Sequence, residues 1–279
     1  MSIRLLFSLV LVIASIAGCV DPGSVRVGDP PSPAAGGETA QDGVCPAADA
    51  PLAVRTITLP VAQFGAGDAR RAGAVVEIFA DDAILRGDAC AAQDCARVRS
   101  DESGMVSATL RVGSRFAYRV LPDDDGAFVR TLGVGVPLGP DSDAIRAMPR
   151  ALLGAMFAHA AIEPDVTRGH LAGAVRDCRG QPVQGATLRV TDPAGREITD
   201  GRVLFSDPDA PAQLTAAGVA TTASGRFALV NVAPAQTLRV EAWAPGAGGP
   251  RRIACLDAPI EPDALTILPL HAASCEGVR

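Results

Sequence analysis

The chain of 279 residues contains no lysine, three histidines, one tryptophan and one tyrosine. All 25 basic residues are arginine, which we attribute to a GC-rich genome and not to a functional site. The net charge is −6 and the sequence has no basic stripe, which argues against a nucleic-acid-binding protein. Histidine is scarce and the cysteine spacings are irregular, so the sequence predicts no zinc site.

Motifs that carry catalytic chemistry are also missing. The three histidines are His159, in a run with helical spacing, and His170 and His271, at opposite ends of the second half of the chain, and none belongs to a His-Glu-x-x-His helix. The chain has neither a Gly-x-Ser-x-Gly elbow nor a phosphate-binding loop. We therefore predict no catalytic residue, no metal site, no cofactor and no enzyme activity, with the three histidines structural or solvent-facing.

Two polar or glycine-rich segments have structural interpretations. Residues 133–139, "GVGVPLG", lack the strand–loop–helix context of a nucleotide loop and predict an edge strand that ends in a turn. Residues 123–126, "DDDG", predict a solvated turn, because a calcium loop needs more widely spaced oxygen ligands and a distal glutamate. Asp207 and Asp209 are interpreted in the same way.

The sequence has a single long apolar run, Leu5 to Ala17, preceded by Arg4. Its roughly 13 residues are too few to cross a bilayer, which takes about 20. Length, flanking charge and the small residues that follow are typical of a secretory signal peptide. No second run predicts a membrane span.

A cysteine stands at the end of this signal. Ile16-Ala17-Gly18-Cys19 resembles the lipobox of bacterial lipoproteins; the alternative is an ordinary signal peptide with a chance cysteine. The resemblance implies removal of residues 1–18 and attachment of a diacylglycerol to the Cys19 thiol, with fatty acyl chains such as palmitate holding the protein to a membrane of the cell envelope. Because Val20 and not aspartate follows the cysteine, we predict the outer membrane.

Lipidation of Cys19 leaves six cysteines in an exported chain, which predicts up to three disulfides. Cys90 and Cys95 are five positions apart, so closure of a local loop is the simplest pairing. The other four allow three pairings: Cys45, Cys178, Cys255 and Cys275.

Composition divides the chain into segments. Residues 20–50 are rich in proline, glycine, alanine and aspartate, and predict a flexible tether with a reach on the order of 30 Å. Short strands separated by turn clusters then predict a mainly β fold of two β-sandwich domains joined by a short helix. The expected boundaries are 1–18 signal, 19–50 lipidated N-terminus and tether, 52–140 first sandwich, 141–165 linker with helix, 166–272 second sandwich and 273–279 tail.

The linker helix is expected over about 149–161, with Pro149 as its first residue and an apolar face that packs on its own protein. The two halves also look like distant repeats. Residues 73–76 match 185–188, and residues 103–106 match 224–227, in the same order along the chain.

Residues 173–190, with the pattern G-x-V-x-D-x-x-G-x-P-V-x-G-A-x-x-x-V, resemble the opening of a carboxypeptidase regulatory-like domain, and "TTASGRFALVNV", 221–232, is similar to its next signature. The resemblance covers 166–272 well and 52–140 loosely, and implies a seven-stranded, prealbumin-like sandwich without peptidase chemistry. In this reading Phe227 and Leu229 fill the core, and Gly185 and Ala186 keep the start of the second strand slim where another strand crosses.

The resemblance has two further implications. Residues 196–218 lengthen a loop of the family, which makes strand boundaries there uncertain. The first and last strands of the sandwich pair in parallel in this fold, so Cys178 and Cys275 are expected to meet, which leaves Cys45 for Cys255.

These observations predict a non-catalytic envelope lipoprotein that presents β-sandwich modules for structural or protein–protein roles. The alternative is a carbohydrate-binding module. Strand alternation places Leu238, Val240 and Ala242 inward and Trp243 outward, where an exposed aromatic could stack on a sugar unless the insert covers it. The expected partners are the membrane, through the lipid anchor, and an unknown envelope protein or glycan.

Overall fold

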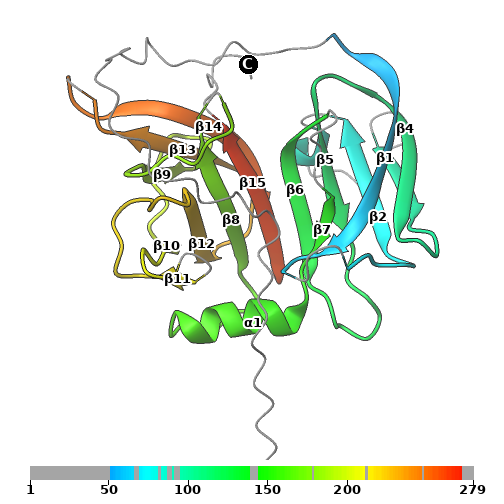
Figure 1. Ribbon diagram of the computed structural model, residues 1–279, viewed down its shortest axis with the longest axis horizontal. Helices are drawn as coiled ribbons and strands as arrows, with labels where there is room; N and C mark the ends of the chain where they lie inside the picture. Colours follow the sequence, from blue (N-terminus) through cyan, green and yellow to red (C-terminus); the bar gives the residue numbers. More distant parts are fainter. Residues whose placement is uncertain are drawn as a thin grey trace, which may run out of the picture. The chain divides into compact units, whose positions relative to one another are not determined.

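The computed structural model describes residues 51–65, 69–80, 83–86, 90, 95–138, 144–177, 179–210, 213–246 and 248–271 (Figure 1). The predicted signal peptide, the lipidation site Cys19, the tether and the tail 273–279 lie outside the described residues. Within the described residues, the longest apolar helix falls short of the length that a membrane span requires.

Two runs of strands flank one α-helix. The first run consists of β1 (Ala53–Gln63), β2 (Val75–Ala80), the short 3₁₀ helix η1 (Ala83–Arg86), β3 (Cys95–Arg99), β4 (Met105–Val112), β5 (Arg115–Val120), β6 (Arg130–Pro137) and β7 (Ile145–Ala147). After α1 (Arg150–His159), the second run consists of β8 (Gly169–Arg176), β9 (Thr187–Thr191), β10 (Arg202–Ser206), β11 (Leu214–Thr215), β12 (Arg226–Val232), β13 (Ala235–Ala244), β14 (Arg251–Ile260) and β15 (Ala264–His271). The predicted mainly β fold is confirmed.

One nine-stranded sheet runs through both halves, in the order β11-β10-β12-β8-β15-β6-β5-β2-β3. Two three-stranded sheets, β4-β1-β7 and β14-β13-β9, pack on its opposite faces. Strand β2 demonstrates this, because neighbouring strand residues point to opposite faces. Ile78 joins the core of the first half with Ile57, whereas Phe79 joins the core of the second half with Val240.

The two halves share a topology, which confirms the predicted internal repeat. In the first half β1 lies between β4 and β7, and its pairing with β7 is parallel. In the second half β8 lies between β12 and β15, and its pairing with β15 is parallel, as the family resemblance implied. The repeats differ in one strand: β3 pairs with β2, whereas its counterpart β10 pairs with β12 and so belongs to the other sheet.

A buried hydroxyl marks the same position in each repeat. The Ser100 hydroxyl accepts the Ala74 N–H at 2.9 Å and donates to the carbonyl three residues before that alanine at 2.6 Å. The Thr221 hydroxyl accepts the Ala186 N–H at 2.9 Å and donates to the equivalent carbonyl at 2.7 Å. Equivalent hydrogen bonds at matched positions show that the repeat extends to local detail.

The matched glycines hold positive φ angles. Gly73 and Gly185 have φ of 74° and 79°, and Gly104 and Gly225 have φ of 76° and 67°. The expectation that Gly185 keeps a strand slim was wrong, because a Cβ there would meet nothing within 4 Å. Its backbone conformation is what requires glycine.

Strand β15 joins the repeats, because it pairs in parallel with β8 on one side and with β6 on the other. The prediction that residues 133–139 form an edge strand was therefore wrong: β6 lies inside the sheet, between β5 and β15. Gly133 on β6 is covered by the Tyr118 ring, which leaves no room for a Cβ at this position. The strand that completes β6 comes more than 120 residues later, where no local pattern could indicate it.

The linker helix α1 forms nearly where it was expected. It begins at Arg150, so Pro149 is the residue before the helix and not its first member. Leu153 and Phe157 are buried against Leu204 and Val230 of the second repeat, which confirms that the apolar face packs on its own protein. The expected insert, 196–218, contains β10 and β11, and β10 is an interior strand of the large sheet.

Candidate functional site

The outer face of the β14-β13-β9 sheet gathers polar side chains around the tryptophan, and we call it the polar sheet face. Strand alternation places Leu238, Val240 and Ala242 in the core, which confirms the predicted inward set. The opposite set faces outward and includes Thr187, Arg189, Thr191, Arg239, Glu241, Trp243, Arg252, Cys255 and Asp257.

Trp243 is half-buried on this face and is held by its neighbours. Its indole Nε1–H donates to Glu241 Oε2 at 3.2 Å, and Arg252 Nη1 donates to Glu241 Oε1 at 3.0 Å. Glu241 is buried although it lies on the outer face, because the indole and the guanidinium cover it. The arrangement fixes the indole orientation and leaves the tryptophan partly accessible.

A second ion pair lies beside this one. Arg239 donates to both carboxylate oxygens of Asp257, at 2.9 and 3.0 Å, and these hydrogen bonds raise the pKa of Arg239. Arg189 is exposed and lies opposite Glu241 in the strand register. The face therefore offers an aromatic ring and guanidinium groups to a ligand, but no nucleophile paired with a base.

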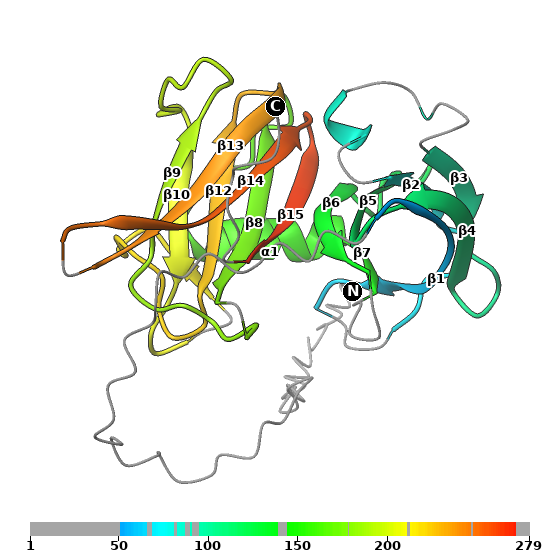
Figure 2. The same ribbon diagram turned by 90° about the horizontal axis from the view of Figure 1, so that it is seen from above.

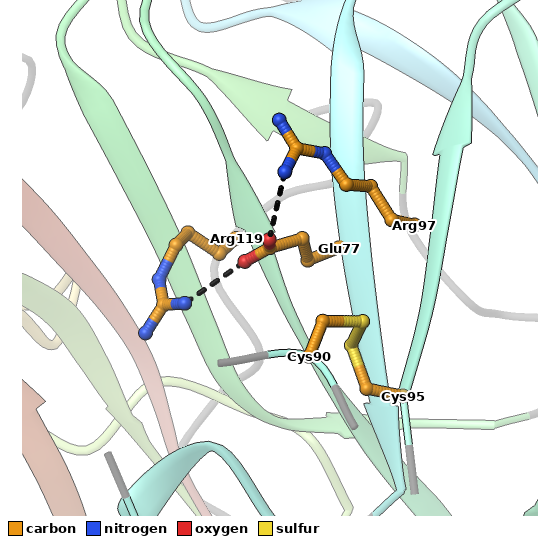
Figure 3. Close-up of a disulfide and its surroundings, with 5 residues drawn as sticks. All are labelled: Glu77, Cys90, Cys95, Arg97 and Arg119. Atoms are coloured by element: carbon orange, nitrogen blue, oxygen red, sulfur yellow. Dashed lines mark hydrogen bonds and ion pairs between the residues drawn. A yellow bond between two sulfur atoms is a disulfide. The ribbon is translucent and has the colours of Figure 1, made fainter. Parts of the chain in front are cut away.

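One predicted disulfide is confirmed. Cys90 and Cys95 are bonded, with their Cα atoms 5.1 Å apart, and the bond joins the start of β3 to the segment after η1 (Figure 3). Cys255 on β14 is also disulfide-bonded, and its partner lies outside the described residues. Cys45, Cys178 and Cys275 lie outside them too, so their pairings stay predictions.

Charged residues near this disulfide form a network that joins the two repeats, and Figure 3 shows its first-repeat part, Arg119, Glu77 and Arg97. Arg119 on β5 donates to Glu77 of β2 at 2.9 Å and to Glu261, in the turn between β14 and β15, at 2.6 Å. Arg130 on β6 donates to the second oxygen of Glu261 at 2.9 Å. Arg97 stands 4.0 Å from Glu77. This network joins first-repeat strands to a second-repeat turn, which is a structural role.

The histidines occupy three separate environments. His159 is exposed at the end of α1. His170 is buried, its Nδ1 accepts the backbone N–H of Asn231 at 3.2 Å, and its ring meets Phe157 edge-on. Burial lowers the pKa of His170 to about 4, so it is neutral at physiological pH. His271 is half-buried at the end of β15. The prediction of structural or solvent-facing histidines holds for His159 and His170.

The acidic turns are engaged in local contacts. Asp123 pairs with the buried Arg71, whose guanidinium stacks on Phe128 at 3.6 Å. Asp125 accepts the Ala127 N–H, and Asp207 accepts the N–H of Asp209. In the part of the chain that the structure describes, no three histidine, cysteine or acidic residues are grouped to hold a metal ion.

A small apolar cavity of about 20 Å³ lies under α1, among Phe64, Met156, Phe157, His170 and Leu204. That volume is close to the space that one water molecule occupies. The cavity is therefore a packing defect beneath the helix and not a ligand site.

Comparisons with known proteins identify no family for this chain. No protein-family model matches it. No curated protein sequence matches it either. A solved structure of a double mutant of the shaft pilin SpaA from Lactobacillus rhamnosus GG is 12% identical, covers 81% of this chain and 100% of its own, and has a TM-score of 0.25.

Two further solved structures give similar values. The Bacillus anthracis TIE protein is 11% identical, with 78% of this chain and 34% of its own covered and a TM-score of 0.24. A streptococcal ancillary pilin is 14% identical, with 78% and 62% covered and a TM-score of 0.21. Because these scores lie below 0.5, we base the function of this chain on its own residues.

Proposed function

We propose that this chain is a non-catalytic lipoprotein of the cell envelope, and that it presents two fused β-sandwich repeats for a structural or protein–protein role. The observation that carries the proposal is the parallel pairing of β15 with β6, which builds one sheet from both repeats. The Arg119–Glu261 ion pair and a core shared by Phe79 and Val240 strengthen the same junction. A body joined in this way resists bending between its repeats and suits a spacer or scaffold.

Lipid anchoring is part of this proposal and rests on the lipobox resemblance at Cys19. A Cys19→Ser variant removes the sulfur that would carry the diacylglycerol, so we expect an exported protein that is unprocessed or partitions into the aqueous phase. The measurement is detergent partitioning, together with the sensitivity of signal cleavage to globomycin. Ser15→Ala, just outside the motif, is the matched control and should behave like the wild type.

Mature wild-type protein in the aqueous phase would show that the chain is not a lipoprotein. Fractionation of inner and outer membranes then tests the proposed outer-membrane location, which is supported by Val20 after the cysteine. A pull-down from the native envelope, with the anchored protein as bait, tests for a protein partner.

We also propose that the second repeat is a carboxypeptidase regulatory-like domain. The parallel β8–β15 pair supports it, as do the positive φ angles of Gly180, Gly185 and Gly225, which stand at the glycine positions of the motif. Phe227 and Leu229 are buried in the core, as that resemblance implied. An experimental structure with a different strand order in 166–272 would remove this assignment.

The second candidate function is carbohydrate binding, favoured by the partly accessible Trp243 among arginines on the polar sheet face. A glycan array probed with the folded part of the protein, residues 51–271, should show binding that is lost in Trp243→Ala. The exposed Arg196→Gln, elsewhere on the repeat, is the control and should keep the binding. Absence of binding to every glycan would leave the structural role as the only proposal.

A further inference from the structure

Basic side chains gather at one end of the shared sheet, at the last residues of two parallel strands. Arg176 ends β8, and His271 ends β15 directly opposite it in the register. On the other side of β8, Arg226 at the start of β12 is paired with Ala174, two residues before Arg176. Adjacent strands lie about 4.8 Å apart, so Arg176 and His271 are direct neighbours, and Arg226 lies diagonally across from Arg176 on the next strand.

These three side chains share one face of the sheet. The residues that alternate with them, Val175, Leu270 and Phe227, are buried in the core of the second repeat. Arg176, His271 and Arg226 therefore point to the opposite face. Arg176 and His271 are half-buried and Arg226 is exposed, so solvent reaches the group.

Arg115 adds a further charge from the first repeat. It opens β5 and is paired with Pro137, the last residue of β6. Because β6 runs parallel to β15, Arg115 lies at the same end of the sheet as His271. Strand alternation, with Phe116 in the first-repeat core and Ala117 in the second-repeat core, starts the Arg115 side chain on the other face, but at this rim of the sheet its charge still acts on the His271 imidazole. We name Arg115, Arg176, Arg226 and His271 the basic corner. It lies away from α1, whose Phe157 contacts His170 near the start of β8.

Three members of the basic corner, Arg115, Arg176 and His271, have little acidic compensation among the described residues. Among the described residues, no carboxylate forms an ion pair with Arg115, Arg176 or His271, and Arg176 donates one Nη1–H to the Gly180 carbonyl at 2.7 Å. The adjacent Asp177 accepts the backbone N–H groups of Arg179 and Gln181 through Oδ1, which commits that oxygen to its own turn.

Mutual repulsion within the corner is visible at His271. Burial lowers the pKa of this imidazole, and the nearby charges of Arg115 and Arg176 lower it further. Among the described residues, no carboxylate raises it. An anion placed among these side chains would relieve the repulsion and favour the protonated imidazole.

We propose that the basic corner is a binding site for a phosphate group. Arginine guanidinium groups are planar forks that match tetrahedral oxyanions, and a protonated imidazole adds another N–H donor. The phosphate can come from a soluble phosphate ester or from a phospholipid headgroup. The site does not depend on catalysis or on Trp243, so it goes beyond the proposed function.

The first experiment measures anion binding by NMR. The His271 imidazole signals of the folded part, residues 51–271, are followed while inorganic phosphate is added. We expect a saturable shift of His271 and none of His159. Arg115→Gln and Arg176→Gln should each weaken binding about tenfold or more, since each removes one of the charges. Arg111→Gln, an exposed arginine on β4 in the first repeat's three-stranded sheet, is the matched control and should bind as the wild type does.

Sulfate is the probe for the pH dependence of anion binding, because its charge is constant between pH 5 and pH 8. Binding should tighten as pH falls through the His271 titration, and the dependence should vanish in His271→Gln. Thermal unfolding of each variant separates a lost site from a lost fold, and Arg115→Gln is the cleaner variant because it breaks no described hydrogen bond.

Vesicles distinguish the two sources of phosphate. Binding to phosphatidylglycerol vesicles but not to phosphatidylcholine vesicles, reduced in Arg115→Gln, identifies a lipid headgroup as the ligand. Binding of inorganic phosphate without vesicle binding identifies a soluble ester. The proposal is overturned if folded wild-type protein binds neither probe, or if the Arg115 and Arg176 variants bind as well as the control.

Discussion

The buried hydroxyls of Ser100 and Thr221 act at the scale of single residues. Each accepts one backbone N–H and donates to one backbone carbonyl, and both partners lie in the segment that leads into the second strand of the repeat. Buried backbone groups without a partner are costly, so each hydroxyl replaces hydrogen bonds that the irregular backbone cannot make with itself.

Removal of either hydroxyl should therefore destabilise the protein. We expect Ser100→Ala and Thr221→Val each to lower the free energy of unfolding by about 1–3 kcal/mol, because each substitution leaves a buried N–H and a carbonyl without their hydrogen-bond partner. Urea denaturation measures the change. Thr221→Ser keeps the hydroxyl and should recover most of the loss; equal losses in Thr221→Ser and Thr221→Val would contradict the role of the hydrogen bonds.

His170 makes stability depend on pH. Its folded-state pKa is about 4, below the ordinary value of 6.5, so the unfolded chain binds more protons between these values. Stability should fall as pH drops from about 6.5 to 4, by about 3 kcal/mol for a shift of this size. Denaturation across this range in His170→Asn should show a smaller loss than in the wild type. The assignment would be contradicted if the loss of stability between pH 6.5 and pH 4 were unchanged in His170→Asn but reduced in the exposed control His159→Gln.

At the scale of elements, the turn between β14 and β15 connects the repeats. Glu261 binds Arg119 and Arg130 of the first repeat, and Asp263 binds Arg150 at the start of α1 through two hydrogen bonds of 2.9 and 2.7 Å. The turn precedes the strand that pairs with both repeats. Ion pairs at this place orient β15 as it enters the sheet.

Glu261→Gln should weaken this junction. The substitution leaves two arginines without their shared carboxylate, and Arg119 is mostly buried, so we expect the free energy of unfolding to fall by about 1–3 kcal/mol. Arg196→Gln breaks the exposed Arg196–Asp192 pair and should cost under about 0.5 kcal/mol. Chemical denaturation of both variants compares the two pairs; equal effects would show that the junction gains nothing from its charges.

The parallel β8–β15 pair also carries a prediction about cysteines. Arg176 is opposite His271, so Cys178 and Cys275 follow neighbouring strand ends by two and four residues. We expect a Cys178–Cys275 disulfide, with Cys45 as the partner of the disulfide-bonded Cys255. Peptide mapping under non-reducing conditions decides this. Recovery of Cys255 linked to Cys178 or Cys275 would refute the pairing and leave the fold unchanged.

At the scale of the whole molecule, the repeats are fused rather than strung together. The strands β6 and β15 pair across them (Figure 2). The second-repeat core includes Phe79, Ala117 and Leu132 from the first repeat. Separation of the repeats would expose apolar side chains on both sides and leave two long strand edges unpaired.

We therefore expect the body formed by residues 51–271 to unfold in one cooperative transition. Differential scanning calorimetry tests this, because a two-state transition gives equal calorimetric and van 't Hoff enthalpies. Two resolved transitions, each with the enthalpy expected for a repeat of about 100 residues, would show that the repeats unfold independently.

Local patterns determined much of this protein from the sequence. Alternation of apolar residues placed Leu238, Val240 and Ala242 in the core, and the run with helical spacing marked α1. The short spacing of Cys90 and Cys95, five positions apart, marked their bond. The matched glycines identified the repeat. Each of these features depends on residues within a few positions of one another, which is the range over which backbone preferences act.

Tertiary structure alone decided the features made by distant segments. The sequence showed β6 as an edge strand because its partner β15 begins more than 120 residues later. The transfer of β10 to the other sheet, the burial of Glu241 on an outward face and the basic corner at Arg176 and His271 have the same origin. The pairing of distant strands depends on which strand edges and sheet faces come into contact in the folded chain, and local sequence patterns do not contain that information.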